Sequence, residues 1–176
     1  MYNITLKGGG DDSRMDFKFT VQTKIQKPVG EVFDAVHNPK KLSKYFTSGG
    51  ASAPLDEGTT VMWTFNDPPG KPITFPVKVQ KVVKNKLIQF SWEASEGVYD
   101  AKTGTMPNSA GYDTVVEMSF EALNPKETLV KIVEGKWRPT EAGLQGSYGN
   151  CQGWMGMSYC LKAYLEYGID LRKGSV

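Results

Sequence analysis

The chain has 176 residues and a formal net charge of +2, and this length fits one domain with a sizeable core. Hydrophobic residues make up 39% and charged residues 23% of the sequence, which excludes a disordered chain. The net charge is small and the basic residues form no stripe, which argues against nucleic-acid binding. No apolar run approaches the roughly 20 residues that span a bilayer. The start is not a signal peptide, so we expect one cytoplasmic domain over residues 1–176 that does not insert into a membrane.

The first part of the chain predicts one strand followed by two short helices. Residues 1–13 contain a run of three glycines and are expected to form a turn or a loose N-terminal arm. Apolar and polar residues then alternate over 15–25, which indicates a strand with one buried face. A helix begins near Pro28 and ends at the His-Asn-Pro sequence that starts with His37, and a second short helix is predicted over 40–45.

The middle of the chain predicts strands joined by turns. These strands are expected at Thr59–Phe65, Ile73–Val79, Ile88–Trp92, Tyr112–Leu123 and Thr128–Arg138. Pro76 lacks a backbone N–H, so its strand is expected at a sheet edge or at a bulge. Residues 94–111 are small and polar without a sustained period, and they predict a long loop. Strands spaced as hairpins make an antiparallel sheet, and helices that cover one face give an α+β fold.

The last element is predicted to be a long amphipathic helix after a loop over 139–149. Its apolar arc comprises Trp154, Met157, Leu161, Tyr164, Leu165 and Gly168. The glycine spacing does not fit a dinucleotide-binding fingerprint. Gly153 and Gly156 make the first turns slim, so either another part of the protein or a ligand is expected to fill the space beside them.

The sequence contains few cysteine and histidine residues that could form a disulfide or bind a metal. Cys151 and Cys160 are nine positions apart on this predicted helix, which separates them by about 13 Å, so they are interpreted as free thiols. These two cysteines and a single histidine, His37, are too few for a typical structural zinc site. We therefore expect neither a metal nor another cofactor.

Residues 25–46 read IQKPVGEVFDAVHNPKKLSKYF and resemble the opening of the SRPBCC superfamily, which contains the START and birch-pollen-allergen-like domains. The similarity is greatest to the branch named after the C-terminal domain of activators of the heat-shock-protein-90 ATPase. Leu55–Gly58 and Gly153–Trp154 fit the same pattern, and the similarity covers about residues 15 to 168. The resemblance implies a helix-grip fold, in which a curved antiparallel sheet wraps around a long C-terminal helix and leaves a cavity between them.

Large apolar side chains are the candidate ligand-binding residues. The predicted set comprises Trp63, Phe75, Phe90, Trp92, Met118, Trp137, Gly153, Trp154 and Met157. Ligand cavities are mostly apolar, and methionine adapts to irregular shapes. The alternative for each of these residues is a place in a filled core, which is the commoner role of such side chains.

The sequence offers few candidates for catalysis, and no catalytic residue is assigned. His37 stands in a helix stop, where a capping or surface role is expected. Glu134, Lys136 and Arg138 share one face of the last predicted strand and can bind an anionic head group, although exposure or pairing on the sheet surface is the commoner role.

Three functions follow from these observations. The first is non-catalytic binding of an apolar or amphipathic small molecule between the sheet and the C-terminal helix. The second is a protein-interaction or chaperone-cofactor module that uses the sheet surface or residues 94–111. The third is a cyclase- or hydrolase-type enzyme, which needs at least two ionisable groups that converge inside the cavity. The oligomeric state stays open between a monomer and a homodimer.

Overall fold

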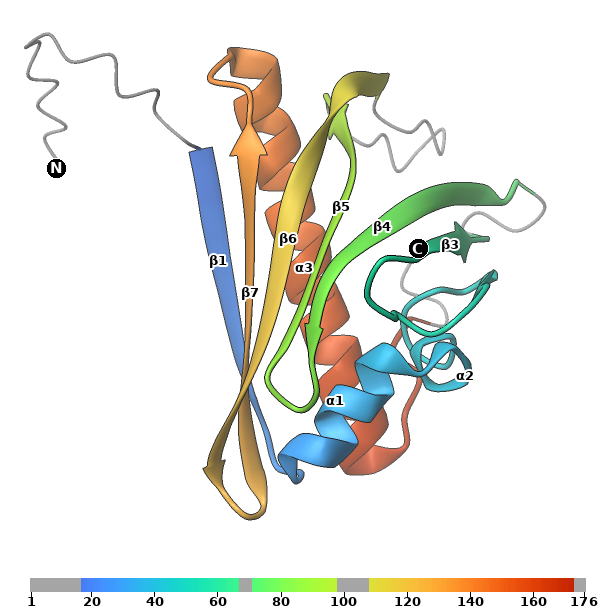
Figure 1. Cartoon of the computed structure of the whole chain (residues 1–176), viewed down its shortest axis with the longest axis vertical. Helices are drawn as coiled ribbons and strands as arrows, with labels where there is room; N and C mark the ends of the chain where they lie inside the picture. The colour runs from blue at the N-terminus through green and yellow to red at the C-terminus, as the bar shows by residue number, and fades with distance from the viewer. Residues whose placement is uncertain (1–16, 67–70, 98–107, 173–176) are drawn as a thin grey trace, which may run out of the picture.

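A seven-stranded antiparallel sheet with a long C-terminal helix against one face forms the framework (Figure 1). The computed structural model describes residues 17–66, 71–97 and 108–172. The predicted N-terminal arm and residues 98–107 of the predicted loop lie outside these ranges. The elements are β1 (Phe17–Ile25), α1 (Val29–His37), α2 (Pro39–Leu42), β2 (Gly50–Ala51), β3 (Thr60–Phe65), β4 (Ile73–Val83), β5 (Leu87–Glu96), β6 (Asn108–Asn124), β7 (Glu127–Trp137) and α3 (Glu141–Tyr167).

The strand order is β1-β7-β6-β5-β4-β3-β2, so the first and last strands of the chain are neighbours. Figure 1 shows the sheet curving so that β3 and β4 diverge from β1 and β7, while α3 runs along its concave side. The helices α1 and α2 lie beside α3 at one end of the sheet. This arrangement confirms the predicted α+β helix-grip fold. No helix in the described ranges is long and apolar enough to cross a membrane, and the cytoplasmic location stays a prediction.

The first half of the chain forms the elements that its pattern predicts. Val21, Thr23 and Ile25 on β1 are buried at every second position, as the period of two requires. Asn38 ends α1 and also caps α2, because its side-chain oxygen accepts a hydrogen bond from the backbone N–H of Lys40 at 3.0 Å. Pro39 then takes the first position of α2, where its missing N–H costs nothing.

Pro76 lies where β4 has a single neighbouring strand. It pairs with Met62 of β3, whereas the ladder between β4 and β5 begins only at Lys78. A register shift follows between Val79 and Lys81. The prediction of an edge or a bulge near this proline is confirmed, since its missing donor interrupts no ladder on the β5 side.

The helix α3 begins about two turns before its predicted start, so the predicted loop over 139–149 is wrong. Thr140 caps it, and the Thr140 hydroxyl oxygen accepts a hydrogen bond from the Gly143 N–H at 3.1 Å. Gly143 and Gly146 face the sheet closely: a Cβ on Gly143 would lie 2.3 Å from the Arg138 carbonyl oxygen, and one on Gly146 would lie 2.5 Å from that of Ser95. These glycines lower helix propensity in the sequence, but the packing requires them.

Gly153 and Gly156 do not create interior space, which corrects the expectation for both. They lie on the exposed side of α3, and a Cβ added to either would meet no atom within 4 Å. The buried side of the same turns carries Trp154, Met157 and Leu161. The slim turns that the fold needs are therefore those of Gly143 and Gly146.

Candidate functional site

Glu134 lies on the buried face of β7, and a bulge directly after it turns Trp137 to the same face. Glu134 pairs with Phe19 of β1 and Trp137 pairs with Phe17, so Gly135 and Lys136 together oppose one residue. Lys136 adopts a positive φ of 71° at this point. The bulge breaks the alternation of the strand, so Glu134 and Trp137 are both buried while Lys136 is exposed. Arg138 is also exposed, so the prediction that Glu134 shares a face with Lys136 and Arg138 is wrong.

The carboxylate of Glu134 is fully buried and accepts hydrogen bonds from four side chains. Its Oε1 accepts from Trp92 Nε1 at 3.0 Å, from Thr114 Oγ1 at 2.7 Å and from Asn150 Nδ2 at 3.1 Å. Its Oε2 accepts from Trp154 Nε1 at 2.7 Å and from Asn150 Nδ2 at 3.2 Å. These partners come from β5, β6 and α3, so one carboxylate joins three strands to the C-terminal helix.

All four partners of Glu134 are uncharged, and within the described residues it belongs to no ion pair. Burial raises the pKa of Glu134, and the hydrogen bonds from Thr114, Trp92, Trp154 and Asn150 offset part of that rise. Indole and amide N–H groups only donate, so they favour the ionised carboxylate. The site therefore combines a buried acid with donors that are oriented toward its charge.

Seven aromatic rings form a continuous group next to this carboxylate. The aromatic cluster comprises Phe46, Trp63, Phe65, Phe75, Phe90, Trp92 and Trp154. Neighbouring ring centroids are 5.2 to 6.2 Å apart, in mostly edge-to-face or tilted arrangements. Phe65, Phe75 and Trp92 are half-buried, whereas the other four rings are buried, so the cluster extends from the core to the surface.

One indole of the aromatic cluster has no hydrogen-bond acceptor in the described part of the chain. Trp63 is fully buried, and its Nε1 lacks a partner among the described residues. Its ring meets Trp92 edge-on with a centroid distance of 5.9 Å, and Trp92 in turn donates to Glu134. A buried donor without an acceptor costs about 1–3 kcal/mol, so such donors are rare in folded proteins.

The comparisons with known proteins agree with this geometry. A family model described as activator of Hsp90 ATPase homolog 1-like protein matches residues 26–166. The chain belongs to this family. The predicted resemblance is therefore confirmed, while no curated protein matches the chain.

Solved structures similar to this family member share its fold at low sequence identity. Protein SSP2350 from Staphylococcus saprophyticus has a TM-score of 0.65 and 21% identity, covering 89% of this chain and 96% of that chain. The Aha1 dimer from Colwellia psychrerythraea has a TM-score of 0.62 and 19% identity, with 86% and 98% covered. CalU16 from Micromonospora echinospora has a TM-score of 0.62 and 14% identity, with 89% and 79% covered.

The structure brings five of the nine predicted ligand-binding residues together. Trp63, Phe75, Phe90, Trp92 and Trp154 all belong to the aromatic cluster. The other four are not rings of this cluster. Met118 and Met157 are buried in the same hydrophobic core as Trp63, Phe90 and Trp154, while Trp137 packs against Gly146 of α3 and Gly153 is exposed.

Sequence reasoning missed the polar half of the site. It assigned no role to Thr114 or Asn150 and placed Glu134 on the sheet surface. A signal was present for Glu134, since it stands two residues after Ile132 and four after Val130 in a period of two, and both of these are buried. A charged residue in phase with buried positions is a candidate functional residue.

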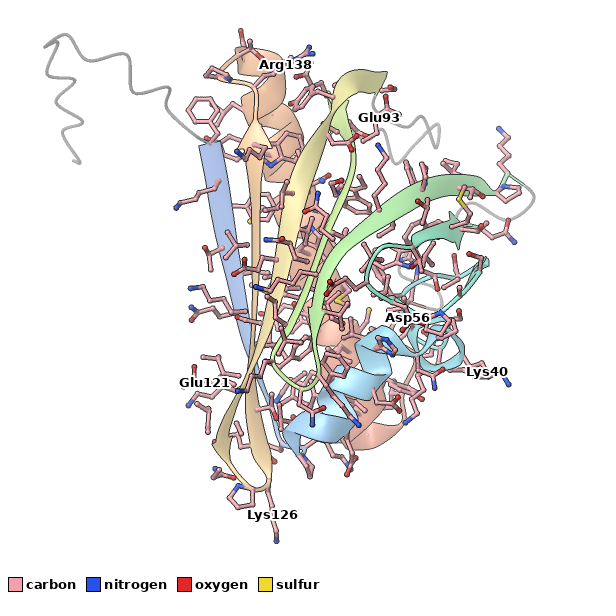
Figure 2. The ribbon with its side chains drawn as sticks, in the orientation of Figure 1. Lys40, Asp56, Glu93, Glu121, Lys126 and Arg138 are labelled. Atoms are coloured by element: carbon pink, nitrogen blue, oxygen red, sulfur yellow. The ribbon has the colours of Figure 1, made fainter. Side chains whose placement is uncertain are left out.

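Among the described residues, the three ionisable groups considered for the enzyme hypothesis, Glu134, His37 and Arg138, do not converge. His37 Nε2 lies 3.0 Å from Asp56 Oδ1, and its ring stacks on Phe33. The guanidinium of Arg138 lies 4.3 Å from the ring centroid of Tyr112. Figure 2 shows Asp56 beside the short helices and Arg138 at the far end of the sheet. Within the described ranges, no group of three or more His, Cys, Asp and Glu residues is arranged to hold a metal ion.

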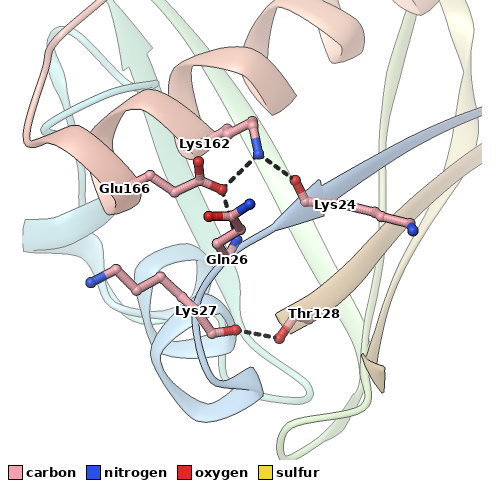
Figure 3. Close-up of polar contacts among 6 residues, drawn as sticks. All are labelled: Lys24, Gln26, Lys27, Thr128, Lys162 and Glu166. Carbon is pink, nitrogen blue, oxygen red and sulfur yellow. Dashed lines mark hydrogen bonds and ion pairs between the residues drawn. The ribbon is translucent and has the colours of Figure 1, made fainter. Parts of the chain in front are cut away.

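A second polar cluster fixes the other end of α3 to β1 (Figure 3). Lys162 Nζ donates to the Lys24 carbonyl oxygen at 2.8 Å and to Glu166 Oε1 at 2.6 Å. The same carboxylate oxygen accepts from the backbone N–H of Gln26 at 2.7 Å. Burial acts to raise the pKa of Glu166, but Lys162 and the Gln26 N–H outweigh it and hold that pKa below its ordinary value.

Proposed function

We propose that this family member binds an apolar or amphipathic small molecule at the aromatic cluster, between the sheet and α3, without catalysing its conversion. The observation that carries the proposal is the fully buried Nε1 of Trp63, which has no acceptor among the described residues. A ligand oxygen or nitrogen beside this N–H would remove a penalty that the protein otherwise bears. The ligand therefore needs an apolar body and a hydrogen-bond acceptor.

The exposure of the aromatic cluster supports access from one side. Phe65, Phe75 and Trp92 are half-buried and lie on β3, β4 and β5, while Trp63 is deeper. Aromatic walls with a few convergent polar groups are typical of small-molecule sites. A ligand that enters past the outer rings would reach Trp63 and the neighbourhood of Glu134.

Binding is favoured over catalysis because the acid next to the aromatic cluster is already engaged, while Arg172, whose guanidinium lies 5.2 Å from the Phe65 ring centroid, stays charged and does not act as a base. In the described part of the chain, the carboxylate beside the rings is that of Glu134, whose oxygens already accept hydrogen bonds from four side chains. General acid–base chemistry needs a group that can reach a substrate proton and, in most sites, a second group to orient it. His37 and Arg138 lie at other places in the fold.

The test compares two buried and unpaired indoles. Native mass spectrometry of the protein from the cells that make it should show a co-purifying molecule, and calorimetry should then give its affinity. We expect Trp63→Phe to weaken binding about 2- to 10-fold, the worth of one neutral hydrogen bond. Trp137→Phe is the matched control, since Trp137 Nε1 is also buried and has no partner among the described residues, but Trp137 packs against Gly146. Equal affinity in the wild type and in Trp63→Phe would contradict the proposal.

A protein-interaction module is the second candidate, and the outer face of α3 favours it. Tyr148 and Tyr159 are 59% and 56% exposed there, beside the exposed Gly149, Gly153 and Gly156. The similar Aha1 from Colwellia psychrerythraea is a dimer. If this face pairs two copies, sedimentation should find a dimer that Tyr159→Lys dissociates. A monomer at all concentrations would exclude pairing through this face.

A further inference from the structure

Glu134 lacks the countercharge that five other acids of the described residues have. The ion pairs of the described residues are Lys27–Glu31, His37–Asp56, Lys41–Asp34, Lys78–Asp113 and Lys162–Glu166. Each of those pairs has at least one exposed or half-buried member, whereas Glu134 is fully buried. Buried charges in proteins are ordinarily paired with an opposite charge, because neutral donors compensate only part of the lost solvation.

The position that a cation would take is held by a neutral amide. Asn150 Nδ2 lies 3.1 Å from Oε1 and 3.2 Å from Oε2, so it bridges both oxygens of the Glu134 carboxylate. An ammonium group favours the same place, since it can donate to both oxygens from there. Asn150 is half-buried on α3, so this carboxylate lies one side chain below the surface. A ligand takes this position only if the Asn150 side chain rotates away.

The faces of two neighbouring tryptophan rings would also favour a positive charge that contacts them. Trp92 and Trp154 are 5.4 Å apart between centroids, and both donate their indole N–H to Glu134. An indole that donates to an anion gains electron density in its ring, because hydrogen-bonded groups polarise one another. The faces of tryptophan rings attract cations more strongly than those of other aromatic side chains.

We infer that the molecule bound at the aromatic cluster carries a protonated amine, which takes the place of the Asn150 amide at Glu134 and lies against Trp92 and Trp154. The inference rests on the proposed function and adds the charge class of the ligand. The apolar body of the ligand occupies the aromatic cluster, and an acceptor atom meets Trp63. A carboxylate or phosphate in the same position would face the buried negative charge of Glu134, so this position disfavours an anionic group, although the Arg172 guanidinium lies 5.2 Å from the Phe65 ring at another part of the cluster.

The test uses three probes with one ring system and different charges: 2-naphthylmethylamine, 2-naphthylmethanol and 2-naphthoate. Calorimetry at pH 7 gives the affinities, and the indole N–H signals of the four tryptophans in NMR spectra report the location. We expect the amine to bind at least about tenfold more tightly than the alcohol, with naphthoate the weakest. The signals of Trp92 and Trp154 should move more than that of Trp137.

Two variants assign the preference to the proposed groups. In Glu134→Gln the amine should lose its advantage, so that amine and alcohol bind within about twofold of each other. In Asn150→Ala, which keeps the carboxylate, the amine should bind at least as tightly as in the wild type while the alcohol is unchanged. The Asn150→Ala variant keeps the inference testable if Glu134→Gln does not fold.

The outcomes separate this inference from the proposed function. If the alcohol binds and shifts the Trp63 signal but the amine binds no better, the charge preference is wrong and small-molecule binding stands. An amine preference that survives in Glu134→Gln, or an equal loss of amine and alcohol binding in Asn150→Ala, would also overturn it. If none of the three probes moves a signal of Trp63, Trp92 or Trp154, the proposed site itself is wrong.

Discussion

At the scale of single residues, Glu134 is the side chain whose removal should destabilise the fold most. Glu134→Ala would leave the donors of Trp92, Trp154, Asn150 and Thr114 without their acceptor. We expect the free energy of unfolding to fall by about 3–5 kcal/mol, the range seen when a buried charged network is broken. Urea denaturation measures this change. Glu117→Ala is the control, since Glu117 is exposed on β6, and a similar loss in both variants would contradict the role of Glu134.

The raised pKa of Glu134 predicts a pH dependence of known sign. Burial holds the folded-state pKa above the unfolded value, so the folded state binds the proton more tightly. The free energy of unfolding should therefore fall as pH rises from the unfolded pKa, about 4.3, toward the folded one. Glu134→Gln does not titrate, so this part of the decline should be absent from its profile. Parallel profiles for both proteins between pH 4 and 8 would refute the prediction.

Replacing Trp63 or Trp154 by Phe and comparing the two variants measures how much one hydrogen bond contributes to stability. Both indoles are buried, but Trp154 Nε1 donates to Glu134 at 2.7 Å whereas Trp63 Nε1 has no acceptor in the described structure. Replacement by Phe removes similar apolar area from each. We expect Trp154→Phe to be less stable than Trp63→Phe by about 2 kcal/mol, because a bond to a charged acceptor is lost. Thermal unfolding of the two variants measures this difference. Equal losses of stability in both would contradict the prediction.

The sequence also failed to predict the orientation of some single residues at the site. The aromatic positions were predictable, since Phe90 and Trp92 stand at alternate positions of a strand. The inward turn of Glu134 and Trp137 together was not, because it depends on the bulge at Gly135 and Lys136. A bulge is a property of two paired strands, and one strand's sequence does not contain its partner's register.

At the scale of elements, the glycines of α3 divide into two classes with opposite expected effects. A methyl group on Gly143 or Gly146 would collide with a carbonyl oxygen, so Ala at either should cost about 1–3 kcal/mol by overpacking. Gly153 and Gly156 are exposed in the helix interior, so Ala at either should add about 0.5–1 kcal/mol of stability. Urea denaturation of the four variants measures both effects. Destabilisation by Gly153→Ala would show that its outer face is packed against something.

The sequence predicted the strands of the sheet but missed the start of α3, and the glycines of α3 explain this difference. Strands β3 to β7 were found because buried positions recur every second residue. The first two turns of α3 were missed because Gly143, Gly146 and Gly149 lower helix propensity locally. Tertiary contact overrides that propensity: the close approach of α3 to Arg138 and Ser95 needs residues without a Cβ. Contacts between segments distant in the chain are not visible in local pattern.

At the scale of the whole molecule, α3 is held to the sheet at two polar points with apolar packing between them. Glu134 fixes Asn150 and Trp154 near the middle of the helix, and the Lys162–Glu166 pair fixes its last turn to β1. Trp154, Met157 and Leu161 cover the core on the same side. A ligand that moves Asn150 therefore acts on the middle of α3, while the β1 end stays fixed.

The β1 end should accordingly control acid stability rather than ligand binding. Because the folded-state pKa of Glu166 is lowered, its contribution is present above the unfolded pKa and is lost as pH falls through the folded one. We expect Glu166→Gln to lower the free energy of unfolding at pH 7 by about 1–2 kcal/mol through weaker bonds to Lys162 and to the Gln26 N–H. The difference from the wild type should shrink toward zero below pH 4.

Guanidinium titrations at pH 7 and pH 3 measure this difference in the free energy of unfolding. Calorimetry should find probe binding at the aromatic cluster unchanged in Glu166→Gln. A constant difference at both pH values would show that the loss comes from packing and not from charge.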